Sequence, residues 1–279
     1  MTKNARNIDP KTVESFGDEW STHDQSTLDE GEHRQILDDY FGIFPWESLP
    51  DDAEGFDMGC GSGRWAKKVA PRVGRLHCID PAEAALAVAR RNLSGQNNAV
   101  FHHASTETAP LAPRSQDFGY SLGVLHHIPD TSAAMANCVS LLKPGAPFLV
   151  YLYYRFDNRP GWYAGIWKAS ELVRATVSRL PPRAKGMAAD FLACTLYWPL
   201  ARAARLAEKL GVRVDNFPLS VYRDKSFMTM RTDSRDRFGT PLEQRFTRKE
   251  ITAMMEQAGL VDIDFSDTPP FWVAVGRKG

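Results

Sequence analysis

A short glycine run and one later carboxylate are the residues of this chain that could do ligand chemistry. The run reads Asp57-Met58-Gly59-Cys60-Gly61-Ser62-Gly63, and Asp80 follows at the end of the next apolar stretch. Glycines at alternate positions remove Cβ atoms from a strand-to-helix turn, so backbone N–H groups can approach a ligand closely. A carboxylate about 20 residues further on can accept hydrogen bonds from the two hydroxyls of a ribose. The pattern therefore predicts a site for a ligand that contains a nucleoside.

The third glycine of this loop distinguishes two kinds of nucleotide ligand. A dinucleotide-binding loop, G-x-G-x-x-G, needs that glycine one position later, where it allows close packing of helix on strand. Arg64 occupies the later position in this chain, and Gly63 comes one residue early. We therefore do not expect a nicotinamide or flavin dinucleotide. The alternative interpretation is a glycine turn in an unrelated α/β protein.

Alternating strand and helix patterns surround the loop and predict an α/β fold with a parallel, doubly wound sheet. Such a sheet binds its ligands at the carboxyl ends of the strands. After the glycine loop, strands are expected at residues 76–79, 100–103, 117–127 and 147–153. Helices are expected at residues 81–93 and 132–142.

Several stretches resemble the class I S-adenosylmethionine (SAM)-dependent methyltransferases, and ubiquinone/menaquinone C-methyltransferase-like enzymes in particular. They are the acidic-G-x-G-x-G loop, Gly123-Val124-Leu125-His126-His127-Ile128-Pro129-Asp130 and Leu141-Leu142-Lys143-Pro144-Gly145-Ala146. The resemblance covers residues 55–153 and 246–276, where a last helix, a sixth strand (261–265) and an antiparallel seventh strand (271–276) are implied. It implies a seven-stranded Rossmann-like sheet, SAM as the cofactor and S-adenosylhomocysteine as the product.

The resemblance also implies which residues bind the cofactor, most of them at the ends of the first four strands. They are Asp57, Gly59, Cys60, Gly61, Gly63, Asp80, Pro81, Ser105, Thr106, Leu122, Gly123 and, near the N-terminus, Trp20. Asp57 would receive the amino group of SAM, and Asp80 would take the ribose hydroxyls. Ser105 stands where many relatives have Asp, so it would accept from the adenine amine without a charge. Trp20 would cover the methionine end of SAM, or alternatively pin a surface helix.

His127 is the candidate general base. Methyl transfer from a sulfonium is an in-line displacement, so catalysis can come mainly from positioning. A base is required only where the attacking atom must lose a proton. His127 follows the fourth strand, and imidazole titrates near working pH. The alternative is that the His-His-Ile-Pro pattern only shapes the loop.

The charges of the chain are unevenly distributed, although 34 basic residues balance 34 acidic ones overall. Between Arg155 and Arg237, 16 Lys/Arg stand against 8 Asp/Glu, a local excess of +8. This segment is too long for a connecting loop. It carries helical patterns at 164–180 and from 187 to 210, the second interrupted by Pro199. We therefore expect an N-terminal helical segment (1–50), a core (51–153 and 241–279) and an inserted cap (154–240).

The cap leaves the sheet beside the expected cofactor, so we expect it to form the acceptor pocket. Tyr153, Tyr154 and Arg155 at its entry, and Arg237 in a charged turn at 233–239, would bind an acceptor with an apolar body and an anionic group. The alternatives are a solvated basic surface and, for Arg237, an internal ion-pair network. Residues 191–198 could rest on a membrane surface. A basic cap with aromatics could also bind single-stranded nucleic acid, which the zero net charge disfavours.

The sequence therefore predicts a SAM-dependent methyltransferase that acts on a small anionic metabolite, such as a sugar nucleotide, a glycan precursor or a carboxylated secondary metabolite. The alternatives are a methyltransferase for RNA or another macromolecule, and a SAM-binding protein that does not transfer methyl. No apolar run has the length to span a membrane, and no secretory signal is visible. Scattered cysteines without metal-ligand spacing favour a reduced, cytoplasmic protein that binds no metal.

Overall fold

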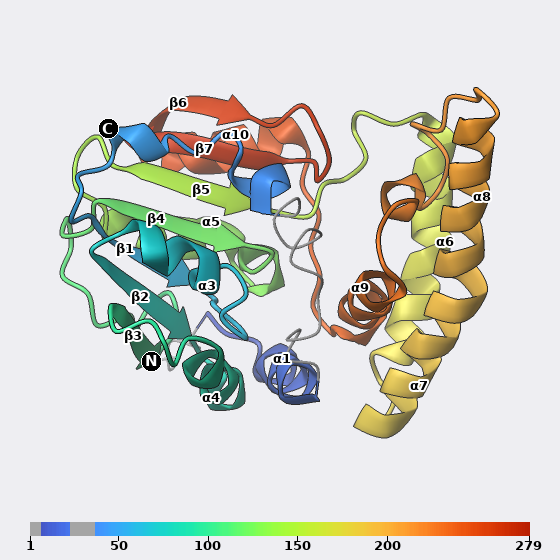
Figure 1. Cartoon of the computed structure of the whole chain (residues 1–279), viewed down its shortest axis with the longest axis horizontal. Coiled ribbons are helices and arrows are strands. Elements are labelled where there is room, and N and C mark those ends of the chain that lie inside the picture. The colour runs from blue at the N-terminus through green and yellow to red at the C-terminus, as the bar shows by residue number, and fades with distance from the viewer. Residues whose placement is uncertain (1–6, 23–36) are drawn as a thin grey trace, which may run out of the picture. The chain divides into compact units, whose positions relative to one another are not determined.

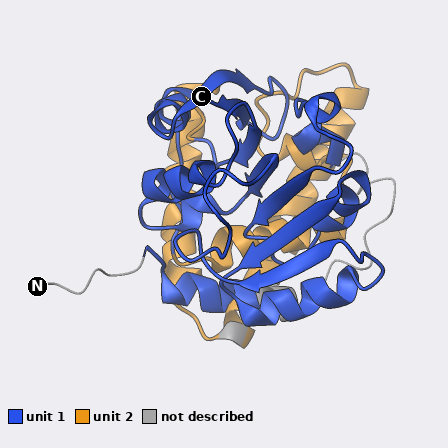
Figure 2. Cartoon of the chain, turned by 90° about the vertical axis from the view of Figure 1, so that its left-hand side faces the viewer, with its two compact units in different colours: residues 1–27, 33–154, 242–279 blue, residues 28–32, 155–241 orange. Residues whose placement is uncertain are grey.

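The computed structural model describes residues 7–22 and 37–279, which fall into two compact units (Figure 2). The core unit, blue in Figure 2, extends as far as Tyr154 and resumes at Leu242. The inserted unit, orange in the same view, comprises the residues from Arg155 to Pro241. Both units have a hydrophobic core of their own.

A seven-stranded sheet forms the centre of the core unit (Figure 1). Its order is β3-β2-β1-β4-β5-β7-β6, and β7 runs antiparallel to both of its neighbours. The strands are β1 Glu54–Met58, β2 Arg75–Asp80, β3 Ala99–His103, β4 Phe118–Leu122, β5 Pro147–Tyr151, β6 Leu260–Phe265 and β7 Val273–Lys278. The expected doubly wound fold with an antiparallel seventh strand is confirmed. Because the chain order reverses between β1 and β4, their carboxyl ends mark the crevice where ligands bind in such sheets.

The helices of the core unit begin and end at residues whose chemistry suits those positions. They are α1 Pro10–Thr22, α3 Ala66–Val69, α4 Glu83–Asn92, α5 Thr131–Ser140 and α10 Arg248–Gln257. Asp130 caps α5 by accepting from the Ala133 N–H, and Thr247 and Glu250 form a capping box on α10. Helix α1 packs on α4, which presents small and apolar side chains such as Ala85 and Leu86 to the protein interior.

Two glycines allow the central strands to carry large rings. Gly55 and Phe118 are register partners on β1 and β4, as are Phe56 and Gly119. A Cβ added at Gly55 would lie 2.3 Å from the Phe118 ring, and one added at Gly119 would lie 2.3 Å from the Phe56 ring. Each ring therefore fills the space above the glycine of the neighbouring strand. Phe118 belongs to one hydrophobic cluster of the core and Phe56 to the other.

Two strands end earlier than the sequence pattern indicated. Strand β4 stops at Leu122 because Gly123 has a φ of +78°, and the expected strand residues Leu125–His127 instead form a 3-10 turn. Strand β5 stops at Tyr151 rather than Tyr153, and beyond it the Tyr153 carbonyl accepts from the Phe246 N–H. The expectation that 117–127 and 147–153 are strands throughout was therefore wrong at their carboxyl ends.

The inserted unit is helical. Its elements are α6 Gly161–Val177, α7 Pro182–Leu192, the π-helical turn η4 Ala193–Tyr197, α8 Trp198–Lys209, the 3-10 turn η5 Ser220–Tyr222 and α9 Phe227–Gly239. Its core joins α6, η4, α8 and α9 through Val177, Tyr197, Ala201, Met230 and Phe238. No helix among the described residues has both the length and the apolar character needed to cross a bilayer.

Two expectations about this unit were wrong. Pro199 does not interrupt the helical run, because it lies in the first turn of α8, where a missing N–H is tolerated, and a π-helical turn precedes it. Residues 233–239 are not a turn but the last part of α9. That helix begins at the cap Ser226, whose hydroxyl accepts from the Thr229 N–H.

We expect Gly119→Ala to destabilise the core unit by about 1–3 kcal/mol, because the new methyl group would overlap the buried Phe56 ring. Chemical denaturation of the purified protein measures this change. Gly95→Ala is the matched control, since a Cβ there meets nothing within 4 Å. A Gly119→Ala protein as stable as the control would contradict the proposed packing.

Candidate active site

The tip of β2 holds the glycine loop in place. The Asp80 carboxylate is buried, and its Oδ2 accepts from the Gly61 N–H at 2.9 Å while its Oδ1 accepts from the Ala82 N–H at 2.8 Å. Burial raises the pKa of Asp80 to about 6, although these two backbone donors oppose that effect. Each carboxylate oxygen accepts one bond and keeps a second lone pair, so the group can still receive ligand hydroxyls.

The loop itself turns sharply where β1 ends. The N–H groups of Gly59 and Cys60 both donate to the Ile79 carbonyl, at 2.7 and 3.1 Å. Gly59 has a φ of +81°, and a Cβ there would lie 2.4 Å from Val124. Gly61 and Gly63 also have positive φ values, which other residues rarely adopt. The predicted glycine loop is thus a backbone surface that side chains would obstruct.

Asp57 is a buried carboxylate near the end of β1. It is 1% exposed, and neither of its oxygens has a hydrogen-bond partner among the described residues. Burial raises its pKa to about 8 and the nearby Asp80 adds to the rise, whereas the Tyr120 hydroxyl acts in the opposite direction. Burying a carboxylate in this way costs free energy unless a ligand compensates it. The position therefore fits a cationic group such as an ammonium.

The other predicted cofactor residues surround the same strand ends. The Gly123 N–H donates to the Tyr151 carbonyl at 3.1 Å, which fixes the end of β4. The Ser105 hydroxyl already contacts the Thr108 hydroxyl at 3.2 Å and accepts from the Glu107 N–H at 3.3 Å, whereas the buried Thr106 hydroxyl has no partner among the described residues. Pro81 follows Asp80 directly, and its carbonyl bonds to a ring nitrogen of His103 at 2.9 Å.

The structure assigns no side-chain contact with the cofactor to two of the predicted cofactor residues. The side chain of Trp20 lies outside the part of the chain that the structure describes, although its backbone belongs to α1. Cys60 is buried, and interaction with Cys78 together with burial raises the pKa of its thiol, so the sulfur stays protonated. Cys60 therefore contributes to the loop through its backbone.

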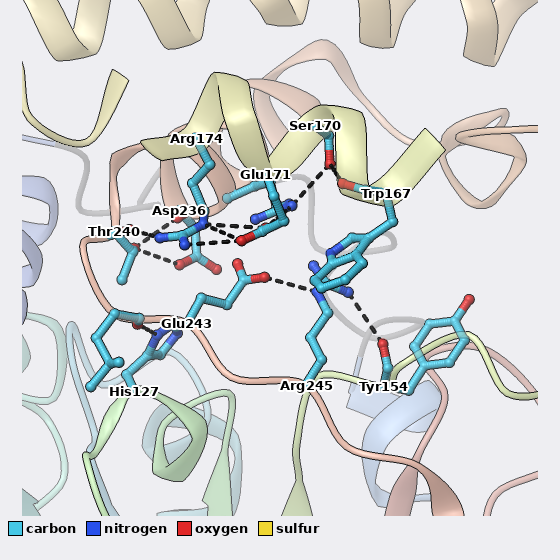
Figure 3. Close-up of polar contacts among 12 residues, drawn as sticks. His127, Tyr154, Trp167, Ser170, Glu171, Arg174, Asp236, Thr240, Glu243 and Arg245 are labelled. Atoms are coloured by element: carbon cyan, nitrogen blue, oxygen red, sulfur yellow. Dashed lines mark hydrogen bonds and ion pairs between the residues drawn. The ribbon is translucent and has the colours of Figure 1, made fainter. Parts of the chain in front are cut away.

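His127 is held by the segment that re-enters the core unit. Its Nδ1 donates to the Leu242 carbonyl at 2.6 Å, so Nε2 is the nitrogen that carries the lone pair (Figure 3). The ring also meets Phe16 of α1 edge to face, with 4.9 Å between centroids. These contacts fix both the tautomer and the orientation of the imidazole. The arrangement is that of an oriented proton acceptor.

His126 differs from its neighbour in environment. It is fully buried and stacks on the Tyr153 ring at 3.9 Å, and both of its ring nitrogens lack hydrogen-bond partners among the described residues. Burial, followed by the proximity of His127 and Arg245, holds its pKa well below the ordinary value. His126 is therefore neutral, and it supports Tyr153 and the loop.

The re-entering segment 242–246 carries residues that sequence reasoning missed. The Gln244 N–H donates to the His126 carbonyl at 3.0 Å, and its side-chain amide donates to the Ile128 carbonyl at 2.7 Å. Arg245 pairs with Glu243 at 2.8 Å and donates to the Tyr154 carbonyl at 3.3 Å (Figure 3). Apart from Glu243, these partners lie more than 90 residues away along the chain, so no local pattern could have indicated them.

The predicted acceptor-binding residues have different surroundings within their own units. Tyr153 lies beside the turn Leu125–His127, which we call the histidine loop, whereas the Tyr154 ring packs with Phe271 and Trp272. Arg155 is exposed where the inserted unit begins.

Arg237 is largely buried within the inserted unit. It forms an ion pair with Glu171 and donates to the Ser170 hydroxyl at 3.0 Å. Burial acts to raise the pKa of Glu171, but hydrogen bonds from Arg174 and Arg237 outweigh it and hold that pKa below its ordinary value. The guanidinium of Arg237 therefore belongs to the internal ion-pair network that the sequence had left as an alternative.

We expect Asp57→Asn to stabilise the ligand-free protein at pH 8 by about 1–3 kcal/mol, because it removes a buried charge. An acid whose pKa is raised on folding stabilises the fold fully below its unfolded pKa of about 3.8 and loses that contribution as pH rises toward 8. The gain should therefore shrink as pH is lowered. Thermal melts across this range measure it, with exposed Asp51→Asn as the control. A constant difference between variant and wild type would refute the assignment.

Comparisons with known proteins address the same region. Residues 56–150 match the family model described as "Methyltransferase domain". The ubiquinone biosynthesis O-methyltransferase of Thiobacillus denitrificans is 33% identical over 168 residues, which cover 60% of this chain and 67% of that protein. The protein of the same name from Aromatoleum aromaticum is 34% identical over 91 residues, 32% of this chain. The chain thus spans only 39% of the length of this second relative.

Solved structures give a weaker likeness. A Thermotoga maritima structure, titled a SAM-dependent methyltransferase and possible histamine N-methyltransferase, is 15% identical with a TM-score of 0.46. The match covers 94% of this chain and 100% of that one.

Proposed function

Because this chain belongs to the class I SAM-dependent methyltransferases, we propose that it transfers the methyl group of SAM to an oxygen atom of a small, anionic metabolite. The observation that carries the proposal is the pair of buried carboxylates at adjacent strand ends. Asp57 has no hydrogen-bond partner among the described residues, and Asp80 keeps unused lone pairs. The names of the curated relatives support oxygen as the acceptor atom.

The residues at the strand ends match the chemical groups of SAM. Asp57 would bind the ammonium of the methionine part, which would remove the cost of its buried charge. Asp80 would accept from the ribose hydroxyls while it holds Gly61 and Ala82. The glycine loop would let the cofactor approach the backbone, and the Thr106 hydroxyl and backbone would face the adenine. When bound, SAM supplies a methyl group activated by its sulfonium.

The histidine loop would orient the acceptor and take its proton. A hydroxyl that attacks a methyl group must lose its proton, and His127 Nε2 is the oriented base for that transfer. The Leu242 carbonyl keeps the proton of the free imidazole on Nδ1, so that Nε2 is ready to accept. Alignment of the reacting atoms would supply most of the acceleration, on the order of 7–11 kcal/mol.

The acceptor class rests on the residues at the entry to the inserted unit. Tyr153 offers an aromatic ring beside the two histidines, and Arg155 an exposed positive charge. We propose that Tyr153 contacts the ring of the acceptor and that Arg155 contacts its anionic group. Tyr154 would support this segment of the chain. Arg237 would act indirectly, through the ion-pair network that joins the helices of the inserted unit. Sugar nucleotides, glycan precursors and carboxylated phenols all present such a combination.

The reaction is tested by incubating the purified protein with SAM labelled in its methyl group and with pools of acidic and neutral metabolites. The proposal expects S-adenosylhomocysteine together with a labelled small molecule from the acidic pool, with the label lost on treatments that cleave methyl esters or ethers. Label in RNA or protein would favour the macromolecular alternative. Tight binding of SAM without turnover would favour a SAM-binding protein that does not transfer methyl.

We expect Asp80→Ala to weaken SAM binding by about 2 kcal/mol or more, since the ribose hydroxyls lose a buried charged acceptor. Titration calorimetry measures the affinity, and circular dichroism confirms that the variant is folded. Asp52→Ala, at an exposed position, serves as the control. Unchanged affinity in the Asp80 variant would place the ribose elsewhere.

His127→Asn should lower kcat for a hydroxyl acceptor by about 10²–10⁴-fold. The asparagine amide can still donate to the Leu242 carbonyl, so the loop is retained while the base is lost. Steady-state kinetics at saturating SAM should show this loss, and SAM affinity should not change. A variant that keeps the wild-type rate would show that His127 only shapes the loop.

A further inference from the structure

The inserted unit presents an unusual number of apolar side chains to solvent. Of the fourteen large hydrophobic side chains that are exposed in the described residues, all except Val261 lie between residues 162 and 221. Scattered exposed hydrophobics are normal, but a contiguous set marks an interaction surface. Most of them lie on α6, α7 and α8; α7 and α8 follow one another through η4 as one long run in Figure 1, and α6 contacts α7.

Helix α6 turns much of its apolar side toward solvent. Its exposed face repeats every three or four residues and is mostly apolar: it consists of Trp162, Gly165, Ile166, Ala169, Leu172, Val173 and Thr176, with Lys168 as its one charged residue. Leu172 is 75% exposed. The opposite side of α6 carries Glu171 and Arg174, which form ion pairs inside the unit. A helix that exposes an apolar stripe of this length presents a face that is not adapted to water.

The run from α7 through α8 repeats the pattern. Met187, Phe191, Trp198, Leu206 and Leu210 are exposed along it, whereas Ala189, Ala193, Tyr197, Ala201 and Ala204 are buried. Tyr197 and Ala201 share a core with α9. The exposed side chains therefore point away from α9. We call the exposed stripes of α6 and of α7–α8 together the outer face.

Basic side chains border the outer face. Lys168, Arg179, Arg183, Lys209 and Arg213 are exposed, and none forms an ion pair with a described residue. The acidic groups of the same helices are largely engaged elsewhere: Glu171 with Arg174 and Arg237, Asp190 with Arg231 and Arg235, Glu208 with Arg223. The border therefore carries a net positive charge, although Glu208, between Leu206 and Leu210, is 45% exposed in its ion pair with Arg223.

We propose that the outer face docks on an anionic lipid bilayer, with α6 and α7–α8 lying in the plane of the membrane interface. Exposed apolar stripes with a basic border are the two elements of such binding, since the apolar side chains enter the acyl boundary and the cations contact lipid phosphates. Trp162 and Trp198 suit the interface, where an aromatic ring with one polar edge is stable. A second copy of this chain would present the same positive border, so charge favours the lipid.

Flotation of the full-length protein with vesicles tests the proposal. Vesicles of equimolar phosphatidylglycerol and phosphatidylcholine should carry most of the protein to the top of the gradient. Vesicles of phosphatidylcholine alone should carry at least about tenfold less, and salt should weaken the binding to anionic vesicles. Brominated lipid should quench tryptophan fluorescence in the wild type, and Trp162→Phe should reduce that quenching.

Substitutions separate the apolar and the basic contributions. The triple variant Leu172→Ser, Phe191→Ser, Leu206→Ser should lose at least about tenfold in vesicle partitioning, and Lys168→Gln with Arg183→Gln and Lys209→Gln should remove the preference for anionic lipid. Val261→Ser is the matched control, because this residue is 49% exposed but lies on β6. Thermal melts confirm that each variant is folded.

The proposal is overturned if wild-type protein does not float with anionic vesicles, or if the triple variant floats as well as the control. It is also overturned if light scattering shows a dimer that only the triple variant disrupts while vesicles bind nothing, since the outer face would then join two copies of the chain. The assay contains no SAM or acceptor, so its outcome does not depend on the methyl-transfer reaction.

Discussion

The tip of β2 organises the site by accepting four backbone N–H groups. The Ile79 carbonyl takes those of Gly59 and Cys60, and the Asp80 carboxylate takes those of Gly61 and Ala82. A buried carboxylate is costly unless donors surround it, and here the glycine loop and the start of α4 supply them. The shape of the loop therefore depends on one side chain, and the geometry around the Asp57 carboxylate depends in turn on that loop.

The sequence could predict most of the core unit, because its signals are local. The apolar runs of parallel strands, the glycine loop and the caps of α5 and α10 are each determined by a few neighbouring residues. The ends of β4 and β5 were harder to predict. The residues at 125–127 and at 153 are apolar or aromatic enough to continue a strand. Gly123 ends β4 through its positive φ, and contacts with segment 242–246 then hold His126, His127 and Tyr153 beyond the strand ends. Such contacts join positions far apart in the chain and leave no periodic pattern.

The inserted unit shows why a charge count predicts little about a site. Its positive excess suggested an anion-binding pocket, yet several of its arginines face inward: Arg231 and Arg235 pair with Asp190, and Arg237 with Glu171. Helix α9 was missed because its buried face includes Thr229, Thr232 and Ser234, so its apolar periodicity is weak. Sequence composition records how many charges a segment holds, whereas the fold decides which of them meet a ligand.

The interlocked rings of the central strands limit how this sequence can vary over evolution. Because the Phe56 ring occupies the volume that a side chain at position 119 would need, the two positions cannot change independently. The same holds for Phe118 and position 55. A relative with alanine in place of Gly119 should carry a smaller residue in place of Phe56, and the two substitutions together should cost less than the sum of each alone. Covariation at these pairs would therefore record a packing constraint rather than a change of substrate.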